Sequence, residues 1–502
     1  MAKKRTLHPF DAPQHWVADA DTETSHRYPD VYQVTRPGAV SSHQLMNSHT
    51  FELSTTSEIR MRIELWTAGI WRVRYTKEAF SAQPSYALHP EQEPSGAVLT
   101  VEEDEKIIVL QSDDVLCVIA KENCQLSFYD CHTDETILAE AEPYLERATI
   151  LNGADHLRVS FQCDKEEVFY GLGDKSWDLD LRGRHFQNWN SDAFGYYREK
   201  DPLYRTIPFY YGLKKDLAYG IFFHNTWRTH FDFDSAKDDT VRMWTEGGEM
   251  DYFIMRGPSL NDVAKSYHYL TGLPELPPLW TLGFHQCRWS YYPESRVRKL
   301  AETFRKLSIP CDAIYLDIDY MDGYRCFTWN KEHFPQLGKM ITDLTEDGFQ
   351  TVVMIDPGIR VDEDYHVYKE GVEQDYFCRR TDGKLMRGPV WPSDCVWPDY
   401  TRADVREWWG ELYRELYEAA HVSGFWNDMN EPAVFKVNSL TFPDQVLHGN
   451  DGYPSDHRPV HNIYGQQMSR GTYDGLKSIK PEKRPFVLTR ATFSGGQRFA
   501  AV

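Results

Sequence analysis

The residues best suited to chemistry lie in the stretch 424–432, which reads GFWNDMNEP. A short apolar run leads to Asp428, and Pro432 ends the predicted strand. Trp426 precedes the aspartate by two residues, so both side chains point to the same face of that strand. A carboxylate beside a flat apolar ring could attack the anomeric carbon of a sugar while the aromatic ring supports the sugar ring. The open alternative is a buried structural aspartate, hydrogen-bonded to the N-terminus of a helix.

Similar side chains end other predicted strands of the C-terminal half. Strands predicted at 313–317 and 351–356 end in Asp317 and Asp356, and a strand at 486–490 ends in Arg490. A first strand, at 281–285, leads on to Trp289. Isolated acids at strand ends often only cap helices, but several acids that converge on one mouth indicate a functional site.

Helices alternate with these five strands and must position them. The segment 294–307 predicts an amphipathic helix, because one face carries Val297, Leu300, Ala301, Phe304 and Leu307. Pro335 opens a second helix, and residues 404–420 predict a third. This alternation predicts parallel βα units that close into a barrel, a fold whose active sites lie at the carboxyl ends of the strands.

The N-terminal half shows a different pattern. Short alternating or β-branched runs, such as 59–65 and 106–110, predict a β-sandwich over residues 46–272. Within it lies a long irregular aromatic stretch, 186–204, of the kind that is often functional. Residues 1–45 are polar and predict a loose N-terminal arm, and a proline-rich joint at 273–278 marks the start of the barrel domain, 273–502.

Composition excludes several classes of function. The net charge of −21 disfavours nucleic acid and anionic membranes as partners, since phosphate binding needs a basic surface. Neither a signal peptide nor a membrane span is recognisable in the sequence. Nine scattered cysteines indicate reduced thiols and a cytoplasmic protein, and no spacing predicts a metal site or a cofactor. The sequence makes no prediction of the oligomeric state.

Four motifs carry a family resemblance. They are WNDMNE at 426–431, YLDIDYM at 315–321, RATF at 490–493 followed by Gln497 and Arg498, and VFYGLGD at 168–174. From about residue 45 onward the chain resembles glycoside hydrolase family 31, the retaining α-glucosidases. The resemblance implies an N-terminal β-sandwich of the galactose-mutarotase type followed by an α/β (β/α)8 TIM barrel.

The resemblance also implies roles for the polar residues. Asp428 would be the catalytic nucleophile, and Asp317 would bind hydroxyls of the sugar. Arg490 would reach the same sugar and the nucleophile, where its charge would keep Asp428 ionised. Glu431 matches a supporting residue rather than the acid. A retaining glycosidase needs one carboxylate to attack and a second to protonate the leaving oxygen.

Further positions match the walls of the sugar pocket, although each alone would more often be a core residue. They are Trp289, Ile318, Ile355, Trp391, Trp426 and Met429. Asp319 is expected to support the pocket, and Asp192, on the irregular sandwich loop, to reach the aglycone side. His461, in the motif HNIYG, is expected to be structural.

The expected activity is release of α-linked glucose from the non-reducing ends of oligosaccharides through a covalent glucosyl-aspartate. The intact DMNE at 428–431 favours an α-glucosidase over the xylosidases and lyases of the family. An α-glucosyltransferase shares the same residues and is one alternative; an inactive truncated sugar-binding product is another.

The sequence departs from the family pattern at its C-terminal end. In the family, the segment after Arg490 runs into a Trp-x-Gly-Asp motif that carries the general acid/base, and Val502 stands about one residue short of that tryptophan. Only five of the eight expected barrel strands are recognisable. The prediction is a C-terminally truncated chain with an incomplete barrel, no general acid/base and impaired glucosidase activity.

Overall fold

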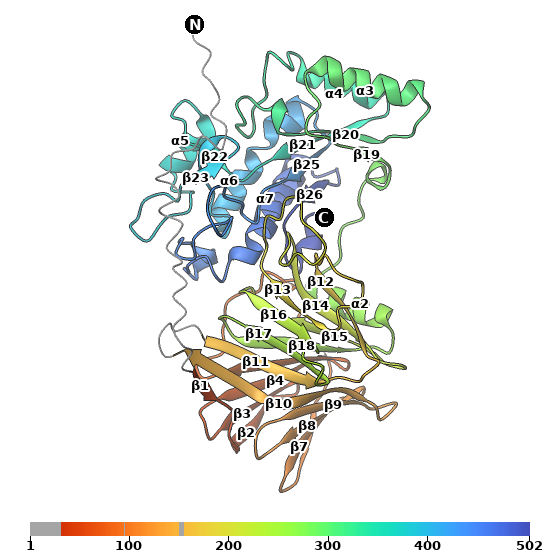
Figure 1. Ribbon diagram of the computed structural model, residues 1–502, viewed down its shortest axis with the longest axis vertical. Helices are drawn as coiled ribbons and strands as arrows, with labels where there is room; N and C mark the ends of the chain where they lie inside the picture. Colours follow the sequence, from red (N-terminus) through yellow and green to blue (C-terminus); the bar gives the residue numbers. More distant parts are fainter. Residues whose placement is uncertain (1–31, 95, 150–154) are drawn as a thin grey trace.

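Alternation of buried and partly exposed side chains is seen in several strands of the N-terminal domain. In the strand β8, Val115–Ala120, every second residue is buried, and β4, Arg60–Thr67, follows nearly the same pattern. Each strand therefore offers one apolar face, and two sheets bury these faces against each other. The computed structural model describes residues 32–94, 96–149 and 155–502, and it places this β-sandwich below an α/β domain (Figure 1).

The sandwich consists of a ten-stranded and an eight-stranded antiparallel sheet. The first has the order β13 (Arg184–Asn188), β16 (Thr229–Phe233), β17 (Thr240–Thr245), β11 (Asp155–Gln162), β10 (Thr136–Thr149), β9 (Leu126–Asp130), β8, β7 (Ile107–Gln111) and β6 (Thr100–Glu103), with β1 (Tyr32–Thr35) on β10. The second has the order β12 (Val168–Gly173), β14 (Thr206–Leu213), β15 (Ala218–Phe223), β18 (Met250–Arg256), β5 (Ile70–Thr76), β4, β3 (Thr50–Thr55) and β2 (Val40–Asn47).

The predicted loose arm at 1–45 is wrong for residues 32–45, and residues 1–31 lie outside the described part of the chain. Strand β1 pairs with β10, and β2 pairs with β3 at the edge of its sheet. Most side chains of β2 are exposed, so its composition is that of a loop although its backbone belongs to the sheet. The sandwich domain also ends in a helix, α2 (Leu260–Thr271), that the strand pattern did not predict.

The α/β domain contains five parallel strands in the order β19 (His285–Gln286), β20 (Ala313–Leu316), β21 (Gln350–Ile355), β25 (Gly424–Asn427) and β26 (Val487–Thr489). The predicted βα alternation is therefore confirmed, with an incomplete barrel sheet of five strands. The first strand is shorter than predicted, because residues Leu279–Leu282 form a 3-10 turn in which Thr281 donates to the carbonyl oxygen of Pro278.

This domain also contains five α-helices, and the second and fifth of them contact strands of the parallel sheet. The five are α3 (Glu294–Lys306), α4 (Leu337–Glu346), α5 (His366–Glu373), α6 (Ala403–Glu411) and α7 (Tyr464–Ile479). The predicted helix at 404–420 is interrupted after α6 and continues as a π-helical turn at Glu415–Ala419. Between β21 and α6, three short strands form a separate sheet: β22 (Ile359–Arg360), β24 (Ser393–Val396) and β23 (Gly388–Val390). In the described chain, none of the helices has the length and apolar character needed to cross a membrane.

Candidate active site

The strand period brings the predicted polar residues to one edge of the parallel sheet. Ile355 pairs with Asn427, and Asn427 pairs with Thr489, so the residues that follow them lie side by side. These residues are Asp356, Asp428 and Arg490. Asp317 follows the neighbouring strand β20. All four therefore meet at the carboxyl ends of the strands, as the sequence predicts.

The buried side chain of Asn430 and two backbone hydrogen bonds fix the alignment of the two loops that carry Asp428 and Arg490. The side chain of Asn430 accepts from the amide of Ala491 at 3.0 Å and donates to Oγ1 of Thr489 at 2.9 Å. The amide of Asp428 donates to Ile355, and the amide of Arg490 donates to Asn427. The NDMN segment is thus tied to both neighbouring strands rather than free to move as a loop.

The guanidinium of Arg490 is shared between two carboxylates. Nε and Nη2 each lie 2.8 Å from an oxygen of Glu431, and Nε also lies 3.3 Å from Oδ1 of Asp428. Glu431 is fully buried, and both of its oxygens accept from Arg490. This arrangement fits the supporting role expected for Glu431, because a fully buried carboxylate paired with Arg490 is not accessible to a substrate.

The charge of Arg490 lowers the pKa of Asp428, which is the direction that the sequence reasoning expects. Burial raises the pKa of Asp428 above its ordinary value, and the Arg490 charge only partly opposes this effect. Burial therefore has the larger effect on this pKa, and the expectation that Arg490 keeps Asp428 ionised stays a prediction. Oδ1 of Asp428 has no hydrogen-bond partner among the described residues.

Asp356 is a member of this cluster to which the sequence reasoning assigned no role. It is 2% exposed, and its Oδ1 has no hydrogen-bond partner within the described residues. Burial raises the pKa of Asp356 well above its ordinary value, and the neighbouring Asp428 charge adds to the shift. Arg490 opposes the rise in pKa of both acids, and its ion pair is with Asp428. Its position at a strand end, like that of Asp317 and Asp428, was the available signal.

Asp317 lies half-buried at the end of β20. Its Oδ1 accepts from the amide of Ile318 at 2.7 Å, and burial raises the pKa of Asp317. Asp319, two residues on, accepts from Nε1 of Trp289 at 3.0 Å and from the hydroxyl of Tyr324 at 3.3 Å. Asp319 therefore anchors an aromatic side chain, in line with the supporting role predicted for it.

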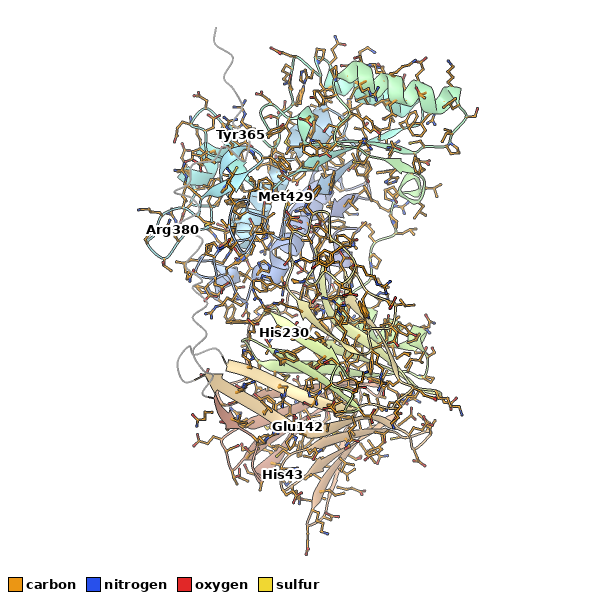
Figure 2. The ribbon with its side chains drawn as sticks, in the orientation of Figure 1. His43, Glu142, His230, Tyr365, Arg380 and Met429 are labelled. Carbon is orange, nitrogen blue, oxygen red and sulfur yellow. The ribbon has the colours of Figure 1, made fainter. Side chains whose placement is uncertain are left out.

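The six predicted wall residues differ in accessibility. Trp289 is 60% exposed, and its ring packs edge-on against half-buried Trp391 at 5.2 Å between centroids. Trp426 is also half-buried and packs against Tyr315. Met429, labelled in Figure 2, lies in the α/β domain with a backbone φ of 57° and is 5% exposed. Ile318 and Ile355 are 2% and 0% exposed and belong to the hydrophobic core, so their contact with a sugar remains a prediction.

The irregular loop of the sandwich approaches the same site. The guanidinium carbon of Arg490 lies 5.1 Å from the ring centroid of Tyr204. Asp192, on that loop, lies close enough for its charge to act on the pKa of Asp428, Glu431 and Arg490. Oδ1 of Asp192 is buried without a described partner. Asp192 thus lies near the cluster, at the place where the two domains meet.

A cavity of about 650 Å³ lies elsewhere, mainly in the sandwich: Arg72, His224 and Trp227 line it, and so does Arg458 of the α/β domain. None of the predicted site residues lines it. The chemistry of the strand-end acids, and not the size of a cavity, therefore locates the candidate active site.

Comparison with known proteins supports both domains. A family model described as the glycosyl hydrolase 31 N-terminal galactose mutarotase-like domain matches residues 60–232, and one described as the glycosyl hydrolases family 31 TIM-barrel domain matches residues 274–502. Among solved structures, a dextranase of Flavobacterium johnsoniae complexed with isomaltotriose superposes with a TM-score of 0.85 and 29% identity, covering 93% of this chain and 56% of the dextranase.

Two curated relatives are named alpha-glucosidases. Alpha-glucosidase 2 of Bacillus thermoamyloliquefaciens is 41% identical over 420 residues, which are 82% of this chain and 51% of the relative. The alpha-glucosidase of Saccharolobus solfataricus is 34% identical over 373 residues, 70% of this chain and 53% of the relative. The chain spans about half the length of these relatives. Since both of its domains match models of one family, the chain belongs to glycoside hydrolase family 31.

Proposed function

We propose that this chain carries the nucleophile and the glucose pocket of a retaining α-glucosidase. The substrates would be oligosaccharides with α-linked glucose at the non-reducing end. The observation that carries this proposal is the largely enclosed Asp428, whose Oδ1 lies 3.3 Å from Nε of Arg490 in an ion pair but accepts no hydrogen bond from the described residues. The alpha-glucosidase relatives support the choice of glucose and of the α linkage.

In the proposed first step, an oxygen of Asp428 attacks the anomeric carbon. The carbon–oxygen bond to the leaving group breaks as the glucosyl-aspartate ester forms, so one difficult substitution is divided into two easier ones. Water then attacks the same carbon and releases Asp428. Arg490 balances the negative charge of Asp428 before attack, and Asp317 would accept hydrogen bonds from hydroxyls of the glucose.

A leaving oxygen of ordinary basicity also needs a proton. Both oxygens of Glu431 accept from Arg490, and Asp356 is almost completely buried. Asp317 accepts from the backbone at the strand end and is assigned to the glucose hydroxyls. None of these three acids is suited to protonate a leaving group, so we propose that the 502-residue chain alone turns over maltose poorly.

The test uses 5-fluoro-α-glucosyl fluoride, followed by intact mass and peptide mapping. Fluoride leaves without protonation, and the ring fluorine slows breakdown of the ester. A glucosyl adduct on Asp428, and none in the Asp428→Asn variant, is the expected result. If this chain stays unlabelled while a full-length relative is labelled in parallel, the proposal fails for this chain. Rapid maltose turnover by the chain alone would refute only the proposal that this chain turns over maltose poorly.

A further inference from the structure

A line of four buried side chains joins the α/β domain to the sandwich loop that carries Asp192. Oδ1 of Asp399 lies 3.0 Å from Nδ1 of His448, and Nε2 of His448 lies 3.0 Å from Nδ1 of His457. Nε2 of His457 lies 2.8 Å from Nδ1 of His461, whose Nε2 lies 2.7 Å from the carbonyl oxygen of Asn190. The four side-chain residues are 0–4% exposed. They form one unbroken hydrogen-bonded line between the domains.

The carbonyl oxygen of Asn190, at the end of this line, determines which nitrogen donates in each of the hydrogen bonds between the histidines. That oxygen only accepts, so Nε2 of His461 donates. Burial lowers the pKa of His461 to about 3, so its ring is neutral and Nδ1 accepts from His457. Burial and the two adjacent rings lower the pKa of His457 well below its ordinary value, so its Nδ1 accepts from His448. Nε2 of His448 therefore donates to His457, and its Nδ1 lies 3.0 Å from the carboxylate of Asp399.

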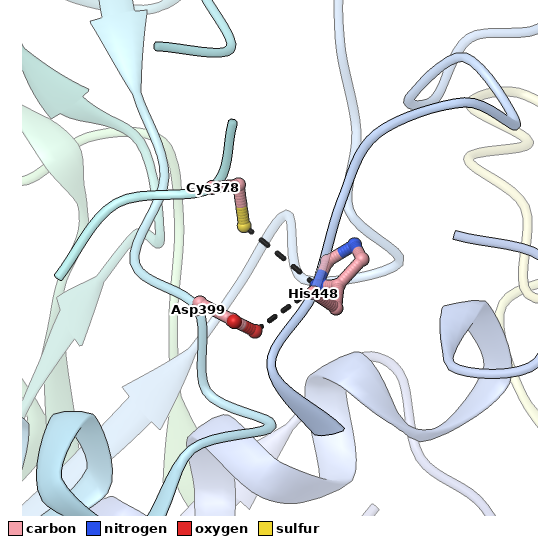
Figure 3. A group of neighbouring side chains, drawn as sticks. All are labelled: Cys378, Asp399 and His448. Carbon is pink, nitrogen blue, oxygen red and sulfur yellow. Dashed lines mark hydrogen bonds and ion pairs between the residues drawn. The ribbon is translucent and has the colours of Figure 1, made fainter. Parts of the chain in front are cut away.

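The Asp399 end of the line is fully occupied. Its Oδ1 also accepts from Oγ1 of Thr401 at 2.6 Å, and its Oδ2 accepts from the amide of Gly449 at 2.7 Å. Figure 3 shows Cys378 beside the same imidazole, with Sγ 3.8 Å from Nδ1 of His448. Cys378, Asp399 and His448 could together offer three metal ligands. A metal there would displace the proton on Nδ1 of His448, which the hydrogen bond to Asp399 requires, so the geometry favours the hydrogen-bonded line.

The other end of the line, at His461, contacts the backbone and a side chain of the sandwich loop. The ring of Trp189 stacks on His461 with 3.6 Å between centroids and an angle of 9°. The amide of Asn190 donates to Oδ1 of Asn462 at 2.9 Å, and its Nδ2 donates to the carbonyl oxygen of Asn462, also at 2.9 Å. Asp192 follows two residues later. The backbone that leads to Asp192 is thus fixed to the α/β domain at its carbonyl, its amide and its neighbouring ring.

We propose that His457 and His461 are positioning residues that act through Asn190 and hold Asp192 at the active site. Neither histidine belongs to the strand-end cluster of acids around Asp428. The ordering of the loop by the line is independent of the proposed function. The contribution of Asp192 to substrate binding, in contrast, rests on the proposed function.

The test is amide hydrogen exchange of the peptide region 186–204, measured by mass spectrometry. In His457→Leu the side chain can neither accept from His448 nor donate to His461, and exchange in this region should rise about tenfold. His457→Gln keeps one acceptor and one donor on a planar group, so it should restore wild-type exchange. Cys378→Ser is the matched control, because it changes a buried neighbour of His448 that is not a link in the line.

A second readout separates this inference from the proposed function. In His457→Leu, the concentration of 5-fluoro-α-glucosyl fluoride for half-maximal labelling should rise as in Asp192→Asn, with the maximal rate unchanged. If the wild-type chain is not labelled at all, the proposed function fails and the exchange result still decides the positioning role. Unchanged exchange in His457→Leu, or equal disorder in the glutamine variant, would overturn that role. If the leucine variant does not fold, His457→Asn, too short to reach both neighbours, takes its place.

Discussion

Arg490 donates to both oxygens of Glu431 at 2.8 Å, although 59 positions separate the two residues in the chain. The pair joins the loop after β25 to the end of β26 and holds the guanidinium beside Asp428. Glu431 thereby acts through the arginine on Asp428, the proposed nucleophile. Glu431 fixes the position of the Arg490 guanidinium charge.

The first prediction concerns this pair. Glu431→Gln should lower the free energy of unfolding by about 3 kcal/mol, because it leaves the partly buried Arg490 charge with one carboxylate partner fewer. Urea unfolding measures the effect. Glu302→Gln on α3 makes the same chemical change in an exposed pair with Lys299, and it should have no measurable effect. Equal stability of the Glu431→Gln variant and the wild type would contradict the assigned role.

The second prediction concerns the pH dependence of labelling. Asp428 must be ionised to attack, so the labelling rate should rise with pH through the raised pKa of Asp428. Arg490→Gln removes the charge that lowers this pKa, and the rise should move to higher pH by about 1 to 3 pH units. The pH–rate profiles of the two proteins with 5-fluoro-α-glucosyl fluoride provide the measurement. Coincident profiles would show that Arg490 does not set the ionisation of Asp428.

The third prediction concerns Asp356, whose pKa in the folded state is well above the ordinary value. A raised carboxyl pKa stabilises the fold at low pH, and this stabilisation is lost as the pH rises toward the folded-state pKa. Asp356→Asn imitates the protonated acid and does not titrate. From about pH 4 upward, the stability of the wild type should fall relative to the variant by at most about 1.4 kcal/mol per pH unit. The free energies of unfolding of the two proteins are measured with urea at each pH. If they change with pH in parallel, the pKa of Asp356 is not raised in the folded state.

The sequence predicted those parts of the site that depend on the strand period. Asp317, Asp356, Asp428 and Arg490 each follow a short apolar strand, and parallel strands bring such ends together. The same reasoning separated the sandwich from the α/β domain. It failed at β2, because an edge strand with exposed side chains has the composition of a loop.

Contacts between distant loops could not be predicted in this way. The approach of Asp192 and Tyr204 to Arg490 depends on how the sandwich sits against the α/β domain, which no local pattern encodes. The line from Asp399 to Asn190 joins residues more than 200 positions apart. His461 was expected to be structural, and the structure gives that expectation a specific content: a neutral ring that donates to the sandwich loop.

The last prediction concerns Asp317, assigned to the hydroxyls of the glucose. Hydrogen bonds from hydroxyls to a carboxylate contribute about 1.5–3 kcal/mol, so Asp317→Asn should raise the half-maximal labelling concentration roughly 10- to 100-fold. The maximal labelling rate should change less, if the contact is equally strong before and during attack. Asp312→Asn is the control, since Asp312 precedes the same strand at its opposite end, where its carboxylate accepts from the amide of Phe284. Equal effects of the two variants would show that Asp317 acts on the strand and not on the sugar.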